Sequence, residues 1–269
     1  MILVLSVVIC LTALAGKAIT VKGSDTMVIL GQRWAEVYMN QNPGVVIQVT
    51  GGGSGVGIAA LINGSTDICE ASRPIKSSEV DKLKERFNST GVEIAVARDG
   101  LAVYLNEENK ITELTLDQLK GIYTGKITSW KELGGEDTKI VLYGRENSSG
   151  TYVYFKENVL TGADFASQTQ TLPGTAAIVN AVAKDKYGIG YGGVAYAKGV
   201  KYCKVKKDSQ TPGYEPTLEN VKSGKYPISR YLYWYVRNKP TGGIKKLVDF
   251  VLSEQGQQIV SKVGYFPVK

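Results

Sequence analysis

The sequence contains no histidine among its 269 residues. This absence excludes the Ser-His-Asp and Cys-His nucleophile systems, histidine-ligated zinc and an imidazole general base. Cysteine is also scarce: the three thiols form no C-x-x-C pair and no metal-ligand spacing, so we expect no metal site. Cys69 and Cys203 allow one disulfide at most, and we expect both to be free, buried, small apolar residues. Eight prolines against 31 glycines predict many tight turns between regular elements, and exclude a collagen-like chain.

The composition that remains is that of a folded protein. Hydrophobic residues make up 43% of the chain and charged residues 21%, which excludes disorder as the main state and allows one large domain or two small ones. The formal net charge is +7, which fits an anionic partner but equally a basic, solvated surface. No basic stripe is interleaved with stacking aromatic residues, so we expect no nucleic-acid partner.

The first residues predict the compartment. Residues 2–14 are almost continuously apolar, and small residues follow at Ala15 and Ala18. The run is short for a membrane span and resembles the apolar core and exit of a secretory signal, although no Lys or Arg precedes it. We therefore expect residues 1–18 to be a signal peptide, with a retained N-terminal membrane anchor as the alternative. The mature protein is expected to be periplasmic or extracytoplasmic.

Beyond this segment, strand and helix patterns alternate. This β-α-β-α-β order favours a parallel or mostly parallel sheet with helices on both faces. Strands are expected at 19–22, 45–49, 92–105, 139–143, 188–191 and 228–236. Helices are expected at 27–38, 58–62, 79–87, 116–122, 153–159 and 176–183, with one last amphipathic helix from about residue 243 through Ile259.

Three of the expected helices begin with Gly and small hydroxyl residues directly after a strand, at 24–27, 53–55 and 148–151. A helix N-terminus presents about four unpaired N–H groups and about half a positive charge. Each motif alone is equally an ordinary helix cap. Loops at the carboxyl ends of parallel strands converge on one crevice, however, so three together predict an anion site. Arg145, four residues before Ser149, could add a bidentate guanidinium.

The glycine-rich loop at 50–57, TGGGSGVG, does not have the pattern of a nucleotide-binding loop. It lacks the Lys-Ser/Thr ending of a P-loop, and no acidic metal ligand follows it. Its glycine spacing is also wrong for a dinucleotide fingerprint. The loop therefore predicts a small oxyanion as ligand, and we expect no cofactor.

A family resemblance follows from six motifs taken in order. They are GSDTM, TGGGSGVG, TDICEASRP, LTLDQLKGIYTGKITSW, GRENSSGT and GIGYGG. Together they resemble the phosphate-binding proteins of ABC transporters, over residues 19–269. The resemblance implies an α/β, two-lobed periplasmic-binding-protein fold, in which each lobe is a mixed, mostly parallel sheet flanked by helices. Two crossover strands would join the lobes, with 19–97 and 228–269 in lobe 1 and 98–227 in lobe 2.

The resemblance also implies a set of phosphate donors. They are Thr26 through its hydroxyl, Met27 through its backbone N–H, Ser54 and Ser72 in lobe 1, with Arg145, Ser149, Gly150 and Thr151 in lobe 2.

The sequence departs from one branch of the family at Arg73. That branch reads A-S-D, with the Asp accepting the phosphate proton, whereas this chain reads A-S-R. Candidate acceptors here are Asp25, Glu70 and Glu146. Asp25 is the best placed, beside Thr26 at an expected helix N-terminus, although it could simply cap that helix. Glu146 could instead orient Arg145.

These observations favour a monomeric receptor that binds inorganic phosphate and delivers it to the membrane permease of an ABC transporter. A receptor for another tetrahedral oxyanion, such as sulfate, molybdate or tungstate, is the alternative. A phosphatase or hydrolase with Ser54 or Ser149 as nucleophile is disfavoured, because the sequence offers neither a base nor a metal cluster. We therefore expect the protein not to be an enzyme.

Overall fold

The computed structural model describes residues 18–268. The expected signal peptide or anchor at 1–18 thus lies, but for its last residue, outside the described residues. No helix of the described part is both long enough and apolar enough to span a membrane. The strands are β1 (Ile19–Gly23), β2 (Ile47–Thr50), β3 (Ile68–Ala71), β4 (Val92–Leu105), β5 (Glu113–Thr115), β6 (Val141–Arg145), β7 (Gln170–Leu172), β8 (Gly188–Gly193), β9 (Lys201–Tyr202), β10 (Lys204–Lys206) and β11 (Ser229–Val236). The helices are α1 (Val28–Gln41), α2 (Ser54–Asn63), α3 (Ser77–Phe87), α4 (Leu116–Tyr123), α5 (Gly150–Asn158), α6 (Gly174–Lys184), α7 (Leu218–Lys222), α8 (Gly242–Leu252) and α9 (Glu254–Val263), with 3-10 turns η1 (Trp130–Leu133) and η2 (Val194–Tyr196).

All of these strands except β5 and β10, which pair with each other, form one mixed sheet that runs through both lobes. Its order is β2-β1-β3-β11-β4-β8-β6-β7, with β9 paired to β4. Strands β1, β2 and β3 are parallel to one another, and so are β6, β7 and β8. The central strands β11 and β4 pair antiparallel with each other and with their outer neighbours. The sheet is thus parallel at each end and antiparallel in the middle, as a mixed, mostly parallel sheet in each lobe requires.

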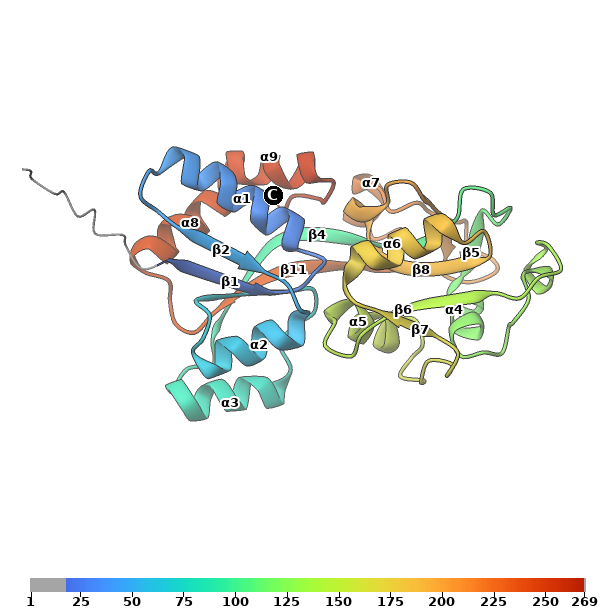
Figure 1. Cartoon of the computed structure of the whole chain (residues 1–269), viewed down its shortest axis with the longest axis horizontal. Helices are drawn as coiled ribbons and strands as arrows, with labels where there is room; N and C mark the ends of the chain where they lie inside the picture. Colours follow the sequence, from blue (N-terminus) through green and yellow to red (C-terminus); the bar gives the residue numbers. More distant parts are fainter. Residues whose placement is uncertain (1–17, 269) are drawn as a thin grey trace, which may run out of the picture.

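Helices cover both faces of the sheet in the first lobe (Figure 1). Helices α1, α8 and α9 pack on one face through apolar residues such as Trp34 and Val251. Helices α2 and α3 pack on the other face through Leu61 and Leu83. The indole N–H of Trp34 donates to the backbone oxygen of Gly256 at 2.8 Å, which ties α1 to α9. All four residues of β3 are buried, as in a strand covered on both faces, and only Glu70 interrupts its apolar sequence.

The second lobe is built in the same way. Alternate side chains of β4 point to opposite faces of the sheet, as a strand requires. Leu101, Val103 and Leu105 enter the core covered by α4 and α5, whereas Ala102 and Tyr104 pack against α6 on the other face. One strand thereby contributes to both cores of this lobe.

Two long strands, β4 and β11, run between the lobes (Figure 1). They are paired over eight residue pairs, from Ser229 opposite Gly100 to Val236 opposite Val92, with a bulge between Leu232 and Tyr233. The amino-terminal part of β4 belongs to the first lobe and its carboxyl-terminal part pairs with β8 of the second. The two lobes, which meet at the site described below, are therefore connected by one continuous pair of strands.

The structure corrects one expected element. The last helix is two helices, α8 and α9, which meet at Ser253. Ser253 has extended backbone angles (φ −70°, ψ 166°), and its hydroxyl accepts from the amide of Gly256 at 3.2 Å, so it ends one helix and caps the next. The thiols of Cys69 and Cys203 are free and buried, as expected, and burial raises the pKa of each well above its usual value.

Candidate functional site

Four polar loops meet where the two lobes touch. In the first lobe they follow the carboxyl ends of β1, β2 and β3, and in the second lobe the carboxyl end of β6. The amide of Gly55 donates to the backbone oxygen of Ser148 at 2.9 Å, from one lobe to the other. The hydroxyl oxygens of Thr26 and Thr151 lie 2.9 Å apart across the same junction. The expected convergence of the loops is thus present, and the lobes are in direct contact there.

Buried hydroxyl groups fill this junction. Ser24 Oγ donates to Ser72 Oγ at 2.9 Å, and Ser54 Oγ lies 3.3 Å from Ser72 Oγ. The amide of Ser72 also donates to Ser54 Oγ at 3.0 Å. All three serines are at most 1% exposed. Each hydroxyl can both donate and accept, so the cluster can adapt to the protonation state of an oxyanion. Ser24 was not among the expected site residues.

Gly150 faces these serines from the second lobe. A Cβ atom at this position would lie 2.7 Å from Ser72 Oγ and closer still to Ser54 Oγ. Gly53 approaches Ser148 in the same way, with a φ of 95° that L side chains rarely adopt. The glycines of both motifs therefore serve the close approach of the two lobes.

The expected donors at the helix starts differ in their present bonds. Ser149 is the N-cap of α5, and its hydroxyl accepts from the amides of Thr151 and Tyr152 at 3.2 and 3.3 Å. The amide of Met27 donates to the backbone oxygen of Ser24 at 2.8 Å, and its side chain is fully buried. The Met27 amide and the Ser149 hydroxyl oxygen thus already have partners within the protein. The assignment of both residues as phosphate donors stays a prediction.

Arg145 is the buried cation of the junction, and its side chain is 1% exposed. Its Nη2 donates to Asp25 Oδ2 and to Glu146 Oε1, each at 2.9 Å, and its Nε donates to Glu146 Oε2 at 3.1 Å. Nη1 donates to Thr175 Oγ1 at 2.8 Å. Burial would raise the pKa of Glu146, but the hydrogen bonds and the charge of Arg145 outweigh it and lower that pKa. Glu146 therefore orients the guanidinium, as one of the two readings of the sequence expected.

Asp25 does not cap helix α1. The N-cap position is Met27, and no side chain of residues 18–268 caps this helix. The Asp25 carboxylate instead accepts from the amide of Gly52 through Oδ1 at 2.9 Å and from Arg145 through Oδ2. Its backbone oxygen accepts from the hydroxyl of Tyr196 at 2.7 Å. The carboxylate thereby connects the glycine-rich loop at 50–57 to Arg145 of the opposite lobe.

Arg73 takes no part in the hydroxyl cluster. Its guanidinium makes a bidentate contact with Glu79, at 2.8 and 2.7 Å, and Nη1 also donates to the backbone oxygen of Pro74 at 2.9 Å. Glu79 in turn accepts from the amide of Lys76 at the start of α3. The arginine at the position of the family's Asp thus fixes β3 to α3, whereas its neighbour Ser72 faces the junction.

Two charged residues of the junction were missed by the sequence reading. Arg230 on β11 and Asp99 on β4 form a buried ion pair, with Nη2 to Oδ2 at 2.9 Å. Arg230 also donates to the backbone oxygen of Ser72 and to Thr151 Oγ1, each at 3.0 Å. A signal existed: the buried residues of β11 alternate, and Arg230 is the charged residue in that apolar series.

Glu70 lies under the site, two residues before Ser72 on β3. It is fully buried, Oε1 accepts from the indole of Trp234 at 3.1 Å, and no hydrogen bond within the described residues satisfies Oε2. Burial raises the pKa of Glu70 to about 8, against the opposing effect of the Trp234 hydrogen bond. Its carboxyl is therefore mostly protonated at neutral pH. Gly31 leaves room for it, because a Cβ there would collide with Glu70 Oε1.

The arrangement suits recognition of a small oxyanion. It offers buried hydroxyls from both lobes, a guanidinium held by two carboxylates, and the starts of helices α1, α2 and α5. The hydroxyl of Ser54 has the hydroxyl and amide of Ser72 as partners, and that of Ser149 has backbone amides, so among the described residues neither is paired with a general base. Within residues 18–268 no cluster of acidic or cysteine side chains could hold a metal ion.

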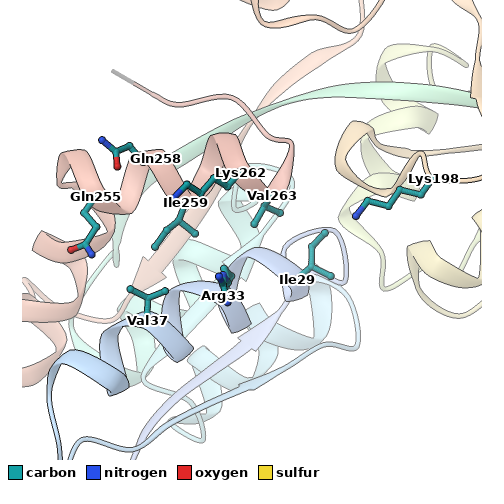
Figure 2. Close-up of a pocket in the computed structure, with 9 residues that line it drawn as sticks. All are labelled: Ile29, Arg33, Val37, Lys198, Gln255, Gln258, Ile259, Lys262 and Val263. Atoms are coloured by element: carbon teal, nitrogen blue, oxygen red, sulfur yellow. The ribbon is translucent and has the colours of Figure 1, made fainter.

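A separate surface groove of about 500 Å³ shares no residue with this junction. Figure 2 shows it between α1 and α9, with Lys198 facing it from the side of the second lobe. Its apolar wall includes Ile29 and Ile259, and its cations are Arg33, Lys198 and Lys262. All of its polar lining residues are exposed, so none of them is a buried polar group aimed at a ligand.

Comparison with known proteins identifies relatives over nearly the whole chain. The model of a PBP superfamily domain matches residues 12–255. The phosphate-binding protein PstS of Pseudomonas aeruginosa is 35% identical over 263 residues, which cover 91% of this chain and 81% of that protein. PstS of Bacillus subtilis is 35% identical over 256 residues, which cover 94% of this chain and 82% of that protein.

Solved structures give the same answer. A phosphate ABC transporter substrate-binding protein of Clostridium perfringens, crystallised with bound phosphate, has a TM-score of 0.85 and 34% identity, and the match covers 94% of this chain and all of that one. An ABC-type phosphate transport receptor of Vibrio cholerae has a TM-score of 0.74 and 30% identity, over 92% of this chain and 99% of that one.

Proposed function

The chain belongs to the phosphate-binding proteins of ABC transporters, within the PBP superfamily, and on this basis we propose that it is a receptor that captures inorganic phosphate between its two lobes and delivers it to a membrane permease. One observation carries the proposal: buried hydroxyl groups of both lobes and the buried Arg145 of the second lobe meet at the junction. A ligand bound there would contact both lobes and hold them closed.

We assign phosphate binding to Thr26, Met27, Ser54, Ser72, Arg145, Ser149, Gly150 and Thr151. Their support is geometric: five of the eight, Thr26, Ser54, Ser72, Arg145 and Thr151, make hydrogen bonds across the junction or within its serine cluster. Asp25 is proposed as the group that senses the phosphate proton. The core residues of each lobe support a division into 19–97 with 228–269, and 98–227, joined by β4 and β11, except that Ile228 packs in the core of the second lobe and Ala195 in that of the first.

Phosphate binding is tested by thermal unfolding and calorimetric titration of the purified protein. Because the ligand binds only the folded state, phosphate should stabilise the protein by about 4 kcal/mol at a thousandfold excess over Kd. Sulfate, molybdate and tungstate, titrated in parallel, test the alternative of another tetrahedral oxyanion. No rise in Tm at millimolar phosphate would refute the assignment.

The same preparation tests the remaining parts of the proposal. We propose a monomer that is not an enzyme, since its relatives are named as binding proteins and, in the part of the chain that the structure describes, no base contacts Ser54 or Ser149. Light scattering should give the mass of one chain, and the protein should release no phosphate from a phosphate ester. We also propose an extracytoplasmic location with residues 1–18 as a secretion signal. N-terminal sequencing of protein recovered from cells distinguishes a cleaved signal from a retained anchor.

A further inference from the structure

Arg230 and Asp99 sit on the two strands that join the lobes. They are directly opposite each other in the antiparallel pairing of β11 with β4. Arg230 Nε and Nη2 donate to Asp99 Oδ2 at 3.1 and 2.9 Å, and Asp99 Oδ1 accepts from the amide of Val194 at 3.1 Å. The two side chains are 3% and 0% exposed. A charge this deeply buried is tolerated only when it is paired, so Asp99 fixes both the charge and the direction of the guanidinium.

From this position Arg230 reaches a loop of each lobe. Nη1 donates to the backbone oxygen of Ser72 in the first lobe, and Nη2 donates to the hydroxyl of Thr151 in the second, both at 3.0 Å. The guanidinium also lies over the ring of Tyr154, 5.3 Å from its centre. Arg230 thus bridges the loop of Ser72 in the first lobe and the start of helix α5 in the second.

The bond to Thr151 has a consequence for its hydroxyl proton. A guanidinium has donors but no acceptor, so Thr151 Oγ1 must accept from Arg230. The single hydroxyl hydrogen of Thr151 is then left for another acceptor. Thr26 Oγ1, 2.9 Å away from the opposite lobe, lies on that side. Arg230 therefore determines in which direction Thr151 can donate.

We propose that Arg230, held in place by Asp99, is a positioning residue for phosphate: it keeps the Thr151 hydroxyl turned as a donor toward the anion and links the loops of both lobes. This inference rests on the proposed function, since it names a further determinant of the same site. It also explains why a charged residue stands in an otherwise apolar strand, where a merely stabilising pair could be replaced by apolar residues.

The test is a double-mutant cycle on phosphate affinity, measured by calorimetric titration. Arg230→Lys keeps the charge but cannot reach Asp99, Ser72 and Thr151 together, and it should raise Kd about 10-fold or more. Thr151→Val removes the hydroxyl and should raise Kd as well. If Arg230 acts through that hydroxyl, the double variant should bind about as well as Thr151→Val alone. Arg237→Lys, just beyond the end of β11, is the matched control and should leave Kd unchanged.

A role confined to folding would give another pattern. It would lower Tm without non-additivity in Kd, so independent effects of the two substitutions would overturn the proposal, as would a wild-type Kd in Arg230→Lys. Should Arg230→Lys fail to fold, Asp99→Asn serves in the same cycle, because it keeps the guanidinium but removes the charge that directs it. Failure of the wild-type protein to bind phosphate would instead refute the proposed function and is distinguishable from both outcomes.

Discussion

Asp25 and Arg145 form an ion pair across the junction of the two lobes, with Oδ2 and Nη2 2.9 Å apart. The residues are 120 positions apart in sequence, and each is held by further bonds in its own lobe: Asp25 by the amide of Gly52, Arg145 by Glu146 and Thr175. A carboxylate of the opposite lobe therefore completes the charge pairing of the buried arginine, and affinity should depend on the shape of this guanidinium as well as on its charge.

Arg145→Lys should weaken phosphate binding by about 1.5–3 kcal/mol although the charge is kept. An ammonium group cannot reproduce the planar set of donors that Arg145 directs at Asp25, Glu146 and Thr175. Calorimetric titration measures the change. Arg73→Lys is the control, because that guanidinium contacts Glu79 away from the junction, and its phosphate affinity should stay at the wild-type value. Equal affinities for Arg145→Lys and the wild type would show that Arg145 is not a ligand-binding residue.

Gly150→Ala should reduce phosphate affinity at least tenfold. The added methyl group would clash with the hydroxyl oxygens of Ser54 and Ser72 in the opposite lobe, so the lobes could not close fully. Alanine is a better helix former than glycine, so α5 itself should not be weakened. Gly243→Ala in α8 is the matched control, since its Cβ would meet only Ile19 at an ordinary 3.6 Å. A normal Kd in Gly150→Ala, with a normal Tm, would contradict the closed arrangement.

Much of the fold and part of the site followed from local sequence patterns. The strand–turn–helix motifs predicted where Thr26, Ser54 and Thr151 lie, because each stands at a helix start whose signals are contiguous. The break between α8 and α9 depended on a single serine inside a continuous amphipathic pattern, which periodicity cannot detect.

Other features of the site were beyond local reasoning. The contact between Arg230 and Asp99 joins positions 131 apart, on two strands whose pairing is set by the tertiary fold. The turning away of Arg73 depends on Glu79 at the start of α3, which supplies a carboxylate that Ser72 and its neighbours do not. The sequence alone does not identify the proton acceptor for the same reason. Asp25, Glu70 and Glu146 all have plausible positions in the sequence, and they differ only in their tertiary contacts.

The buried Glu70 should make stability depend on pH in a defined direction. Its pKa is about 8 in the folded protein against an ordinary value of 4.5, so between these values the folded state binds more protons than the unfolded state. The contribution of Glu70 to the free energy of unfolding should therefore be complete below pH 4.5. It should fall by up to about 1.4 kcal/mol per pH unit as the pH rises toward 8.

Glu70→Gln removes this titration and keeps an oxygen for the indole of Trp234. Urea denaturation without phosphate, at pH 5, 6, 7 and 8, should give a flatter profile for the variant and a stability gain that grows with pH. Glu85→Gln, on the exposed part of α3, is the control and should follow the wild-type profile. Parallel profiles for Glu70→Gln and the wild type would show that Glu70 does not titrate in this range.

The last prediction concerns selectivity between phosphate and sulfate. Near neutral pH phosphate carries a proton and sulfate does not, so a carboxylate facing the ligand accepts from one and repels the other. Arg145, Asp25 and Glu146 together carry one excess negative charge, and Asp25→Asn would bring their sum to zero. The amide can still accept through its oxygen, so the variant should lose discrimination against sulfate, by about tenfold, more than it loses affinity for phosphate.

Competition titration of Asp25→Asn with both anions measures this directly. Because Asp25 does not cap α1, the substitution removes no helix cap, and a change in selectivity would not be a by-product of helix fraying. Asp249→Asn makes the same change in net charge at an exposed ion pair of α8 and should keep wild-type selectivity. Retained selectivity in Asp25→Asn would reject Asp25 as the proton sensor and move that role to Glu146, since Glu70 is buried beneath the site with its pKa raised to about 8 and, being mostly neutral at pH 7, would repel sulfate only weakly.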